Sequence, residues 1–249
     1  MRTLLTLGLG LTLLSNVALA DVYATFNVKA DKEAVLAFTA SGTVAKSFVS
    51  VGSQVKKGDI LAALENSEQK MMLELAKQDF LNASIQAKQS ANSLKRYDKV
   101  KDILDDEKYE KISFATDMAN NTAEKAGFTV RLRQSQLEKT RLRAPFNGVI
   151  TAQAKQIGDA VTGMQVMPFF QIMDTSVIKL VLEFDERYWD KVKVGQTFVY
   201  TVDGSKEKME ARISKVYPTI NSANRKLTAE VMTTNLKPGL FGQGLIKID

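Results

Sequence analysis

The chain has 249 residues, a formal net charge of +6, and neither cysteine nor histidine. These two absences exclude a disulfide framework, a thiol nucleophile, a Ser-His-Asp triad, and metal sites built on thiolate or imidazole ligands. A hydrophobic share of 45% and a charged share of 25% are typical of a folded soluble chain, and the length suggests roughly one to two domains.

Residues 1–20 have the pattern of a secretory signal peptide. Arg2 supplies a short basic region, residues 4–14 are apolar apart from Thr and Gly, and Ala18 and Ala20 stand where a signal peptidase reads small residues. A retained membrane anchor is the alternative, although about 11 apolar residues are short for a bilayer span. We therefore expect a mature chain that is soluble and exported to a bacterial periplasm.

Residues 34–65 and 143–175 contain two copies of a short β repeat. In both copies a Gly is followed by an apolar residue two positions later and by an apolar–Gly pair nine and ten positions later. Gly adopts positive φ without a steric clash, so these positions indicate turns between short strands. One copy of roughly 30 residues is too small for its own core, and we expect the copies to form one split β-sandwich. The predicted turn residues are Gly42, Gly52, Gly58, Pro145, Gly148, Gly158 and Gly163.

The segment between the copies, residues 66–142, is predicted to form an antiparallel helical hairpin. It has no Pro and a single Gly, and its apolar residues recur at alternating three- and four-residue spacing. This spacing is typical of a coiled-coil seam. The first seam is Leu73, Ala76, Phe80, Ala83, Ala87, Ser90, Leu94 and Tyr97, and the second is Ala119, Ala123, Ala126, Val130 and Leu137, interrupted by Arg133.

The tip of the hairpin is expected near the middle of this segment, at Leu104, Asp105 and Asp106. Acidic residues favour a helix N-terminus through capping and through the helix dipole, so the second arm is expected to begin here. Each arm then has about 38 residues and a length of roughly 57 Å at 1.5 Å per residue.

Residues 176–249 are predicted to form a small closed β-barrel. Asp185 can cap a short helix, Gly195 can end it, and Pro238 with Gly239 is a turn signal. Five or six short strands with one helix suit a closed barrel. The strand-like stretches are Val177–Phe184, Thr197–Val202, Met209–Tyr217, Leu227–Thr233 and Gly244–Ile248. An N-terminal strand within residues 21–33 could pair with either β unit.

Three stretches resemble the periplasmic adaptor proteins of tripartite efflux pumps, also called membrane fusion proteins or the HlyD family. Residues 51–61 are similar to the first lipoyl half-motif, residues 140–150 to the return from the hairpin into the second half, and residues 236–241 to the start of the last barrel strand. The resemblance implies an elongated, multi-domain α+β chain. In it, a split lipoyl-like β-sandwich is interrupted by an antiparallel coiled-coil α-hairpin and followed by a small β-barrel.

The resemblance also implies a function that is mechanical and not enzymatic, with no cofactor and no metal. Adaptors of this family assemble as a hexamer or a trimer of dimers. They join an inner-membrane transporter to a TolC-type outer-membrane channel, for export of drugs or other small molecules. A transporter of RND type is expected, with an ABC-type system as the alternative. The protein is then periplasmic in a Gram-negative cell and associated with the inner membrane through its transporter.

The resemblance implies that the hairpin tip docks to the channel. Many adaptors dock through an Arg, a Leu four residues on and a Ser seven further, but here Val100 follows Arg96 at the first spacing. The pair Ile112-Ser113 resembles the start of the family's second arm, which would move the tip later. The expected docking residues are Leu104, Asp105, Asp106, Ile112 and Ser113.

Three other functions compete with this interpretation. A lipoyl or biotinyl carrier needs a modifiable Lys at a tight β-turn, where this chain has its helical insertion; Lys70 lies in the expected helix start. Nucleic-acid binding is not expected, because the charges are mixed in sign and the chain is exported. A metal-efflux adaptor could use thioether ligands for Cu(I), but we expect the methionines to pack in the core. These are Met71, Met72, Met164, Met167 and Met173.

Overall fold

The computed structural model describes residues 21–100 and 105–248. The predicted signal peptide and Leu104 lie outside the described residues. The described chain divides into two compact units, one of residues 21–31 and 175–248 and the other of Lys32–Asp174. Within the described ranges, neither helix combines the length and the hydrophobicity of a membrane span.

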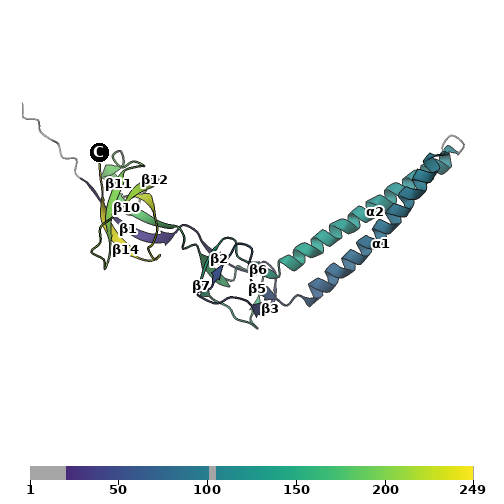
Figure 1. The fold of residues 1–249 in the computed structure, drawn as a ribbon, viewed down its shortest axis with the longest axis horizontal. Coiled ribbons are helices and arrows are strands. Elements are labelled where there is room, and N and C mark those ends of the chain that lie inside the picture. The colour runs from purple at the N-terminus through teal and green to yellow at the C-terminus, as the bar shows by residue number, and fades with distance from the viewer. Residues whose placement is uncertain (1–20, 101–104, 249) are drawn as a thin grey trace, which may run out of the picture. The chain divides into compact units, whose positions relative to one another are not determined.

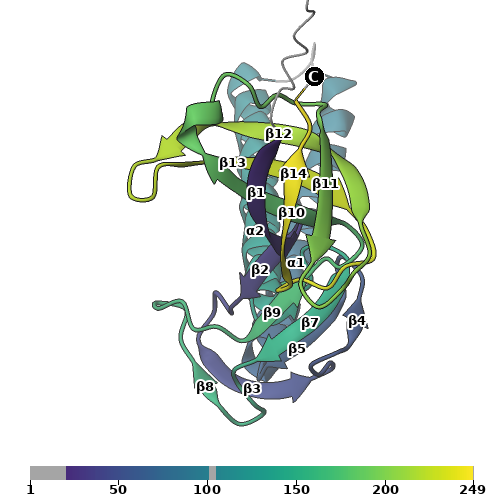
Figure 2. The same cartoon turned by 90° about the vertical axis from the view of Figure 1, so that its left-hand side faces the viewer.

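The first unit is a closed barrel of six antiparallel strands in the order β1-β10-β13-β12-β11-β14 (Figure 1). Its first strand is the N-terminal one, which pairs with β10 and β14, so the strand predicted after residue 20 joins the barrel and not the sandwich. β1, β14 and β11 lie side by side in Figure 2. The strands are β1 (Val22–Ala30), β10 (Ile178–Asp185), β11 (Thr197–Val202), β12 (Met209–Asn221), β13 (Lys226–Thr233) and β14 (Phe241–Ile246).

Alternating burial along these strands builds the barrel core. The rings of Phe198 and Tyr200 stack with centroids 5.4 Å apart, and Phe26 meets Phe198 edge-to-face at 5.8 Å. β14 makes room for these rings, since a Cβ on Gly244 would lie 2.7 Å from the Phe198 ring. The interior is thus filled by side chains and is not a pore.

Two parts of the barrel differ from the sequence prediction. The helix after β10 is only the short 3-10 turn η2 (Glu186–Tyr188), because Val192 must turn into the core before β11 begins. β12 runs longer than predicted and pairs with β13 as far as Asn221. Its ladder breaks between Val216 and Ile220, where Pro218 has no N–H to donate.

The second unit contains a sandwich of two four-stranded sheets in the orders β2-β9-β7-β4 and β6-β5-β3-β8. Each sheet takes strands from both copies of the repeat, which confirms the split β-sandwich. Phe169 and Phe170 are buried between the sheets, with ring centroids 4.7 Å apart. The strands are β2 (Glu33–Leu36), β3 (Gly42–Ser47), β4 (Gln54–Val55), β5 (Ile60–Leu64), β6 (Arg141–Arg143), β7 (Gly148–Gln153), β8 (Ala160–Val161) and β9 (Phe170–Met173).

The glycines of the repeat fall into two groups. Gly52, Gly58 and Gly158 have φ of 90°, 93° and 92°, which is the turn geometry that favours Gly. Gly148 and Gly163 do not have positive φ; they are needed for space, since a Cβ on Gly148 would lie 2.5 Å from the Met173 carbonyl oxygen. Gly42 opens strand β3 with extended backbone.

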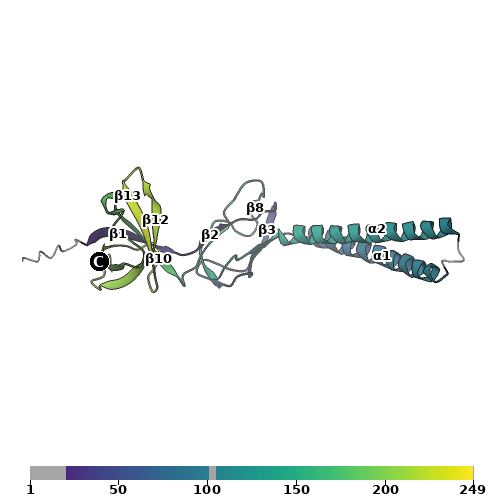
Figure 3. The same cartoon turned by 90° about the horizontal axis from the view of Figure 1, so that it is seen from above.

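The sandwich is interrupted by two long antiparallel helices, α1 (Ser67–Asp98) and α2 (Asp106–Glu138), which lie side by side in Figure 3. The helices meet along the predicted seams. Thr116 also packs between them, with its hydroxyl 3.3 Å from the Ser90 carbonyl. Gly127 faces the Phe80 ring, where an added Cβ would lie 3.2 Å away. At 1.5 Å per residue, α1 is roughly 48 Å long.

Candidate functional site

Buried polar contacts hold the two ends of the hairpin together at its base. The Asn66 side-chain amide donates to the Thr140 hydroxyl at 3.0 Å, and that hydroxyl donates to the Leu137 carbonyl at 2.7 Å. Asn66 is 8% exposed and Thr140 is 2% exposed, so water does not compete for these bonds. The start of α1 and the end of α2 are therefore held together where they leave the sheet.

Charged residues reinforce the same base. The Glu65 carboxylate accepts from the backbone N–H groups of Asn66 and Ser67 and from the Ser67 hydroxyl, and these bonds lower the pKa of Glu65. Glu138, at the end of α2, accepts from Arg141 at 2.9 Å and from Arg143 at 3.0 Å. Arg143 also donates to the Gly58 carbonyl at 2.8 Å, which ties the helix end to a sandwich turn.

The hairpin is also tied near its tip. The Tyr109 hydroxyl of α2 donates to the Asp98 carboxylate at the end of α1 at 2.7 Å, and this bond raises the pKa of Tyr109. Lys108 lies 5.9 Å from the ring centroid of Tyr97. Both contacts cross from one helix to the other, so the two arms remain together as far as their last turns.

The predicted docking residues do not all lie at the tip. Asp105 is the N-cap of α2 and accepts from the Glu107 N–H, and Asp106 is the first helical residue; both are exposed. Ile112 and Ser113 lie inside α2 and are only partly exposed. The second arm thus begins at Asp106 and not near Ile112, because the acidic cap starts the helix earlier.

Sequence reasoning missed the contact between Asp98 and Tyr109. No local pattern marks such a pair, because its members stand on different helices and meet only when the chain turns back. Tyr97 did belong to the predicted first seam, which was the only available signal for this part of the tip.

Large apolar side chains are exposed along both helices, outside the seam. In α1, Met71 and Leu75 are 63% and 66% exposed, and in α2, Phe128 and Leu132 are each 55% exposed. Residues four apart lie on one face of a helix, so the two side chains of each pair belong to one exposed apolar stripe. The α1 stripe is Met71, Leu75, Leu81 and Ile85, and the α2 stripe is Phe114, Met118, Phe128 and Leu132.

The prediction that the methionines pack in the core is wrong for three of them. Met71, Met72 and Met164 are 63%, 38% and 96% exposed, whereas Met167 and Met173 are partly buried. The sequence pattern places Met71 beside the seam residue Leu73, but helical geometry turns the two side chains to different faces. Among the described residues, no cluster of His, Cys, Asp or Glu could hold a metal ion.

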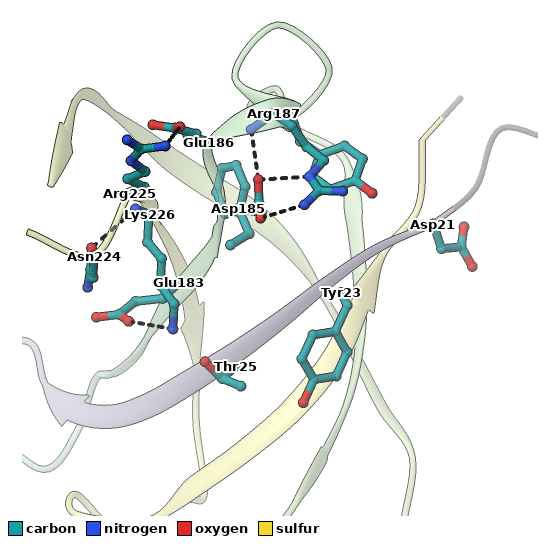
Figure 4. A pocket seen from close by; sticks show the side chains of 12 residues that line it. Asp21, Tyr23, Thr25, Glu183, Asp185, Glu186, Arg187, Asn224, Arg225 and Lys226 are labelled. Atoms are coloured by element: carbon teal, nitrogen blue, oxygen red, sulfur yellow. Dashed lines mark hydrogen bonds and ion pairs between the residues drawn. The ribbon is translucent and has the colours of Figure 1, made fainter. Parts of the chain in front are cut away.

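The barrel carries an open cavity of about 810 Å³ where β1 starts, β10 ends and β13 starts (Figure 4). Its charged side chains are mostly paired. Asp185 accepts from Arg187 at 2.9 Å, and this contact lowers the pKa of Asp185. Lys226 lies 3.3 Å from Glu183 and belongs to the same wall. Glu186 faces Arg225 at 3.9 Å. These pairs make a polar wall of mixed charge and not a site for one small ion.

Comparison with known families matches residues 32–174 to the CzcB-like barrel-sandwich hybrid domain. An uncharacterised protein of Haemophilus influenzae is 26% identical over 200 residues, which cover 79% of this chain and 48% of that protein. The cobalt-zinc-cadmium resistance protein CzcB of Cupriavidus metallidurans is 25% identical over 232 residues, which cover 85% of this chain and 42% of CzcB. The chain thus spans less than half the length of these curated relatives.

Solved structures share the fold. A MacA–MexA chimera carrying the Pseudomonas aeruginosa MexA α-hairpin domain is similar with a TM-score of 0.77 at 22% identity, over 92% of this chain and 82% of that chain. The membrane fusion protein Spr0693 of Streptococcus pneumoniae R6 is similar with a TM-score of 0.73 at 17% identity, over 92% and 99%. Together with the barrel, sandwich and helical hairpin, these likenesses confirm the predicted fold class.

Proposed function

Because the chain belongs to the family of CzcB-like proteins with a barrel-sandwich hybrid domain, we propose that it is a non-enzymatic periplasmic adaptor of an efflux system. It links an inner-membrane transporter to a TolC-type outer-membrane channel, and residues 1–20 direct its export. The observation that carries the proposal is the hairpin, a pair of helices of 32 and 33 residues inserted between the two halves of one sandwich.

The hairpin acts as a stiff spacer. Its buried seam resists separation of the arms, and the contacts of Asn66 with Thr140 and of Tyr109 with Asp98 hold the arms at both ends. A spacer that is held in this way transmits position over tens of ångströms without an internal hinge. Its exposed tip presents Asp105 and Asp106 to the channel.

Self-assembly completes the adaptor. A closed ring needs two different complementary faces on each copy, so that each copy contacts its neighbour head to tail. The α1 and α2 stripes are such faces. Because Gly127 faces Phe80, Leu132 stands at about the same height in the hairpin as Leu75. The α1 stripe of one copy and the α2 stripe of the next can therefore pack without an axial shift, in a hexamer or a trimer of dimers.

The cargo is a small molecule, and an RND-type transporter is the proposed partner. A second candidate cargo is a divalent transition-metal ion, which is favoured by the match to a cobalt-zinc-cadmium resistance protein over 85% of this chain. The adaptor itself need not bind the cargo in either case. The two candidate cargoes are distinguished by the growth of a strain that lacks this protein, measured on drugs and on cobalt, zinc or cadmium salts.

Site-specific photo-cross-linking in cells tests the adaptor function. A cross-linker at Asp106 is expected to capture an outer-membrane channel, because this residue is exposed at the tip. The matched control is Glu124, an exposed residue in the middle of α2, where capture of a second copy of the chain is expected instead. Equal capture of the channel from both positions, or none from Asp106, would contradict tip docking.

A further inference from the structure

The loop between β10 and β11 displays the single Trp of the chain to solvent. Trp189 is 68% exposed and Val194 is 62% exposed. A Trp seldom lies so open, because its ring gains much by burial and its N–H seeks a partner. Lys191 and Lys193 are exposed in the same short stretch. This loop therefore combines an amphipathic aromatic, an aliphatic side chain and two cations.

The backbone of this loop is held in place by buried side chains and by hydrogen bonds. Val192 is 4% exposed and belongs to the barrel core, and Tyr188 packs against that core. The Gln196 side chain accepts from the Lys193 N–H at 2.8 Å and donates to the Lys191 carbonyl at 3.0 Å. The loop is thus preorganised, and binding through Trp189 needs little further ordering.

Most carboxylates around this loop are already neutralised. Asp185 pairs with Arg187, Glu186 faces Arg225, and Lys247 pairs with the Asp21 carboxylate. Neither Lys191 nor Lys193 forms an ion pair with any described residue. Asp190 is the acid that stands between Trp189 and these lysines. One carboxylate and two ammonium groups of the loop are thus outside the ion pairs, and their net charge is positive.

This end of the barrel also holds the start of β1. Val22, at the start of β1, pairs with Ile246, and the Lys247 N–H donates to the Thr197 carbonyl at the start of β11. The start of β1 and the loop that carries Trp189 therefore lie at the same end of the barrel.

We propose that the loop of residues 186–196 binds an anionic lipid surface, with Trp189 and Val194 at headgroup depth. Trp is enriched at membrane interfaces because its ring is apolar while its N–H stays hydrated. Lys side chains place their charge among lipid phosphates while their stems cover apolar surface. Each cation near an anionic leaflet strengthens binding. Lipid binding by this loop is a property beyond the proposed adaptor function, and its absence would leave channel docking unaffected.

Intrinsic fluorescence tests the proposal directly, because all tryptophan emission comes from position 189. The mature chain, residues 21–249, is titrated with vesicles of phosphatidylethanolamine and phosphatidylglycerol, and separately with vesicles of phosphatidylcholine alone. We expect a blue shift and quenching by brominated lipid with the anionic vesicles, both reversed by high salt. An emission spectrum that stays typical of water-exposed Trp in anionic vesicles overturns the proposal.

Two double variants test whether the lysines of this loop make the contact with the vesicle. Lys191→Gln/Lys193→Gln is expected to weaken the fluorescence titration about 30-fold. Lys206→Gln/Lys208→Gln removes two exposed lysines at the same spacing, in the loop between β11 and β12 at the other barrel end, and should titrate like the unaltered chain. Equal titrations for both variants overturn the proposal, as does a blue shift that appears only when a transporter protein is added.

Discussion

Asn66 and Thr140 show how two residues far apart in the sequence can secure the hairpin. They stand 74 positions apart and meet through one hydrogen bond of 3.0 Å in a place from which water is excluded. An unpaired polar group in such a place loses its hydration without compensation, so the pair matters more than an exposed contact of the same length. The sequence contains both residues but no signal that joins them.

We expect Asn66→Ala to lower the free energy of unfolding by about 1 to 2 kcal/mol, because it removes a buried hydrogen bond. Urea denaturation followed by circular dichroism measures this change. Asn121→Ala, at an exposed position of α2, serves as the control and should be neutral or slightly stabilising. A loss for Asn66→Ala no larger than that of the control would show that the base contact contributes nothing.

The two helices were the most predictable elements of the chain. Seam residues such as Leu73, Ala76 and Leu137 are buried, as the three- and four-residue spacing predicts. Burial in the seam extends to Thr116, which the apolar pattern omits because Thr is polar. Its hydroxyl can be buried because it donates to the Ile112 carbonyl at 2.9 Å. The short η2 turn was the least predictable element, since its length depends on the closing barrel.

Ala87→Pro should break α1 in the middle of its seam. Ala87 is 8% exposed, and Pro there loses a helix hydrogen bond and clashes with the preceding turn, at a cost of about 3 kcal/mol. Ala87→Gly is the graded control, with an expected cost of about 1 kcal/mol from helix propensity. Thermal melts of both variants measure the difference. A melt of the proline variant that matches the glycine variant would argue against a continuous helix at this position.

At the scale of the whole molecule, the exposed stripes of the hairpin have the character of an interface. Leu75 and Leu132 are 66% and 55% exposed, on different helices and at about the same height. Large apolar side chains that recur on one helix face are costly to leave in water and are typical of surfaces that a partner covers. Two different faces on one chain favour a ring over a simple two-fold dimer.

Leu75→Glu and Leu132→Glu should each abolish ring formation while leaving the helical content unchanged, because neither side chain is in the seam. Analytical ultracentrifugation of the separate variants is expected to show monomers. Their equimolar mixture is expected to form dimers only, since one intact α1 stripe and one intact α2 stripe remain to meet. Rings in either variant alone, or no dimer in the mixture, would contradict a head-to-tail interface through these stripes.

The sequence by itself determined the fold class, since hydrophobic spacing and Gly positions are local and depend on the period of helix or strand. It also determined the absence of Cys and His chemistry, which is a matter of composition. Tertiary structure alone decided which β unit receives β1 and that Met164 is exposed. It also decided that Trp189 is exposed on a braced loop. These outcomes depend on contacts between residues far apart in the chain, and the free energy of such contacts exists only once the core has closed.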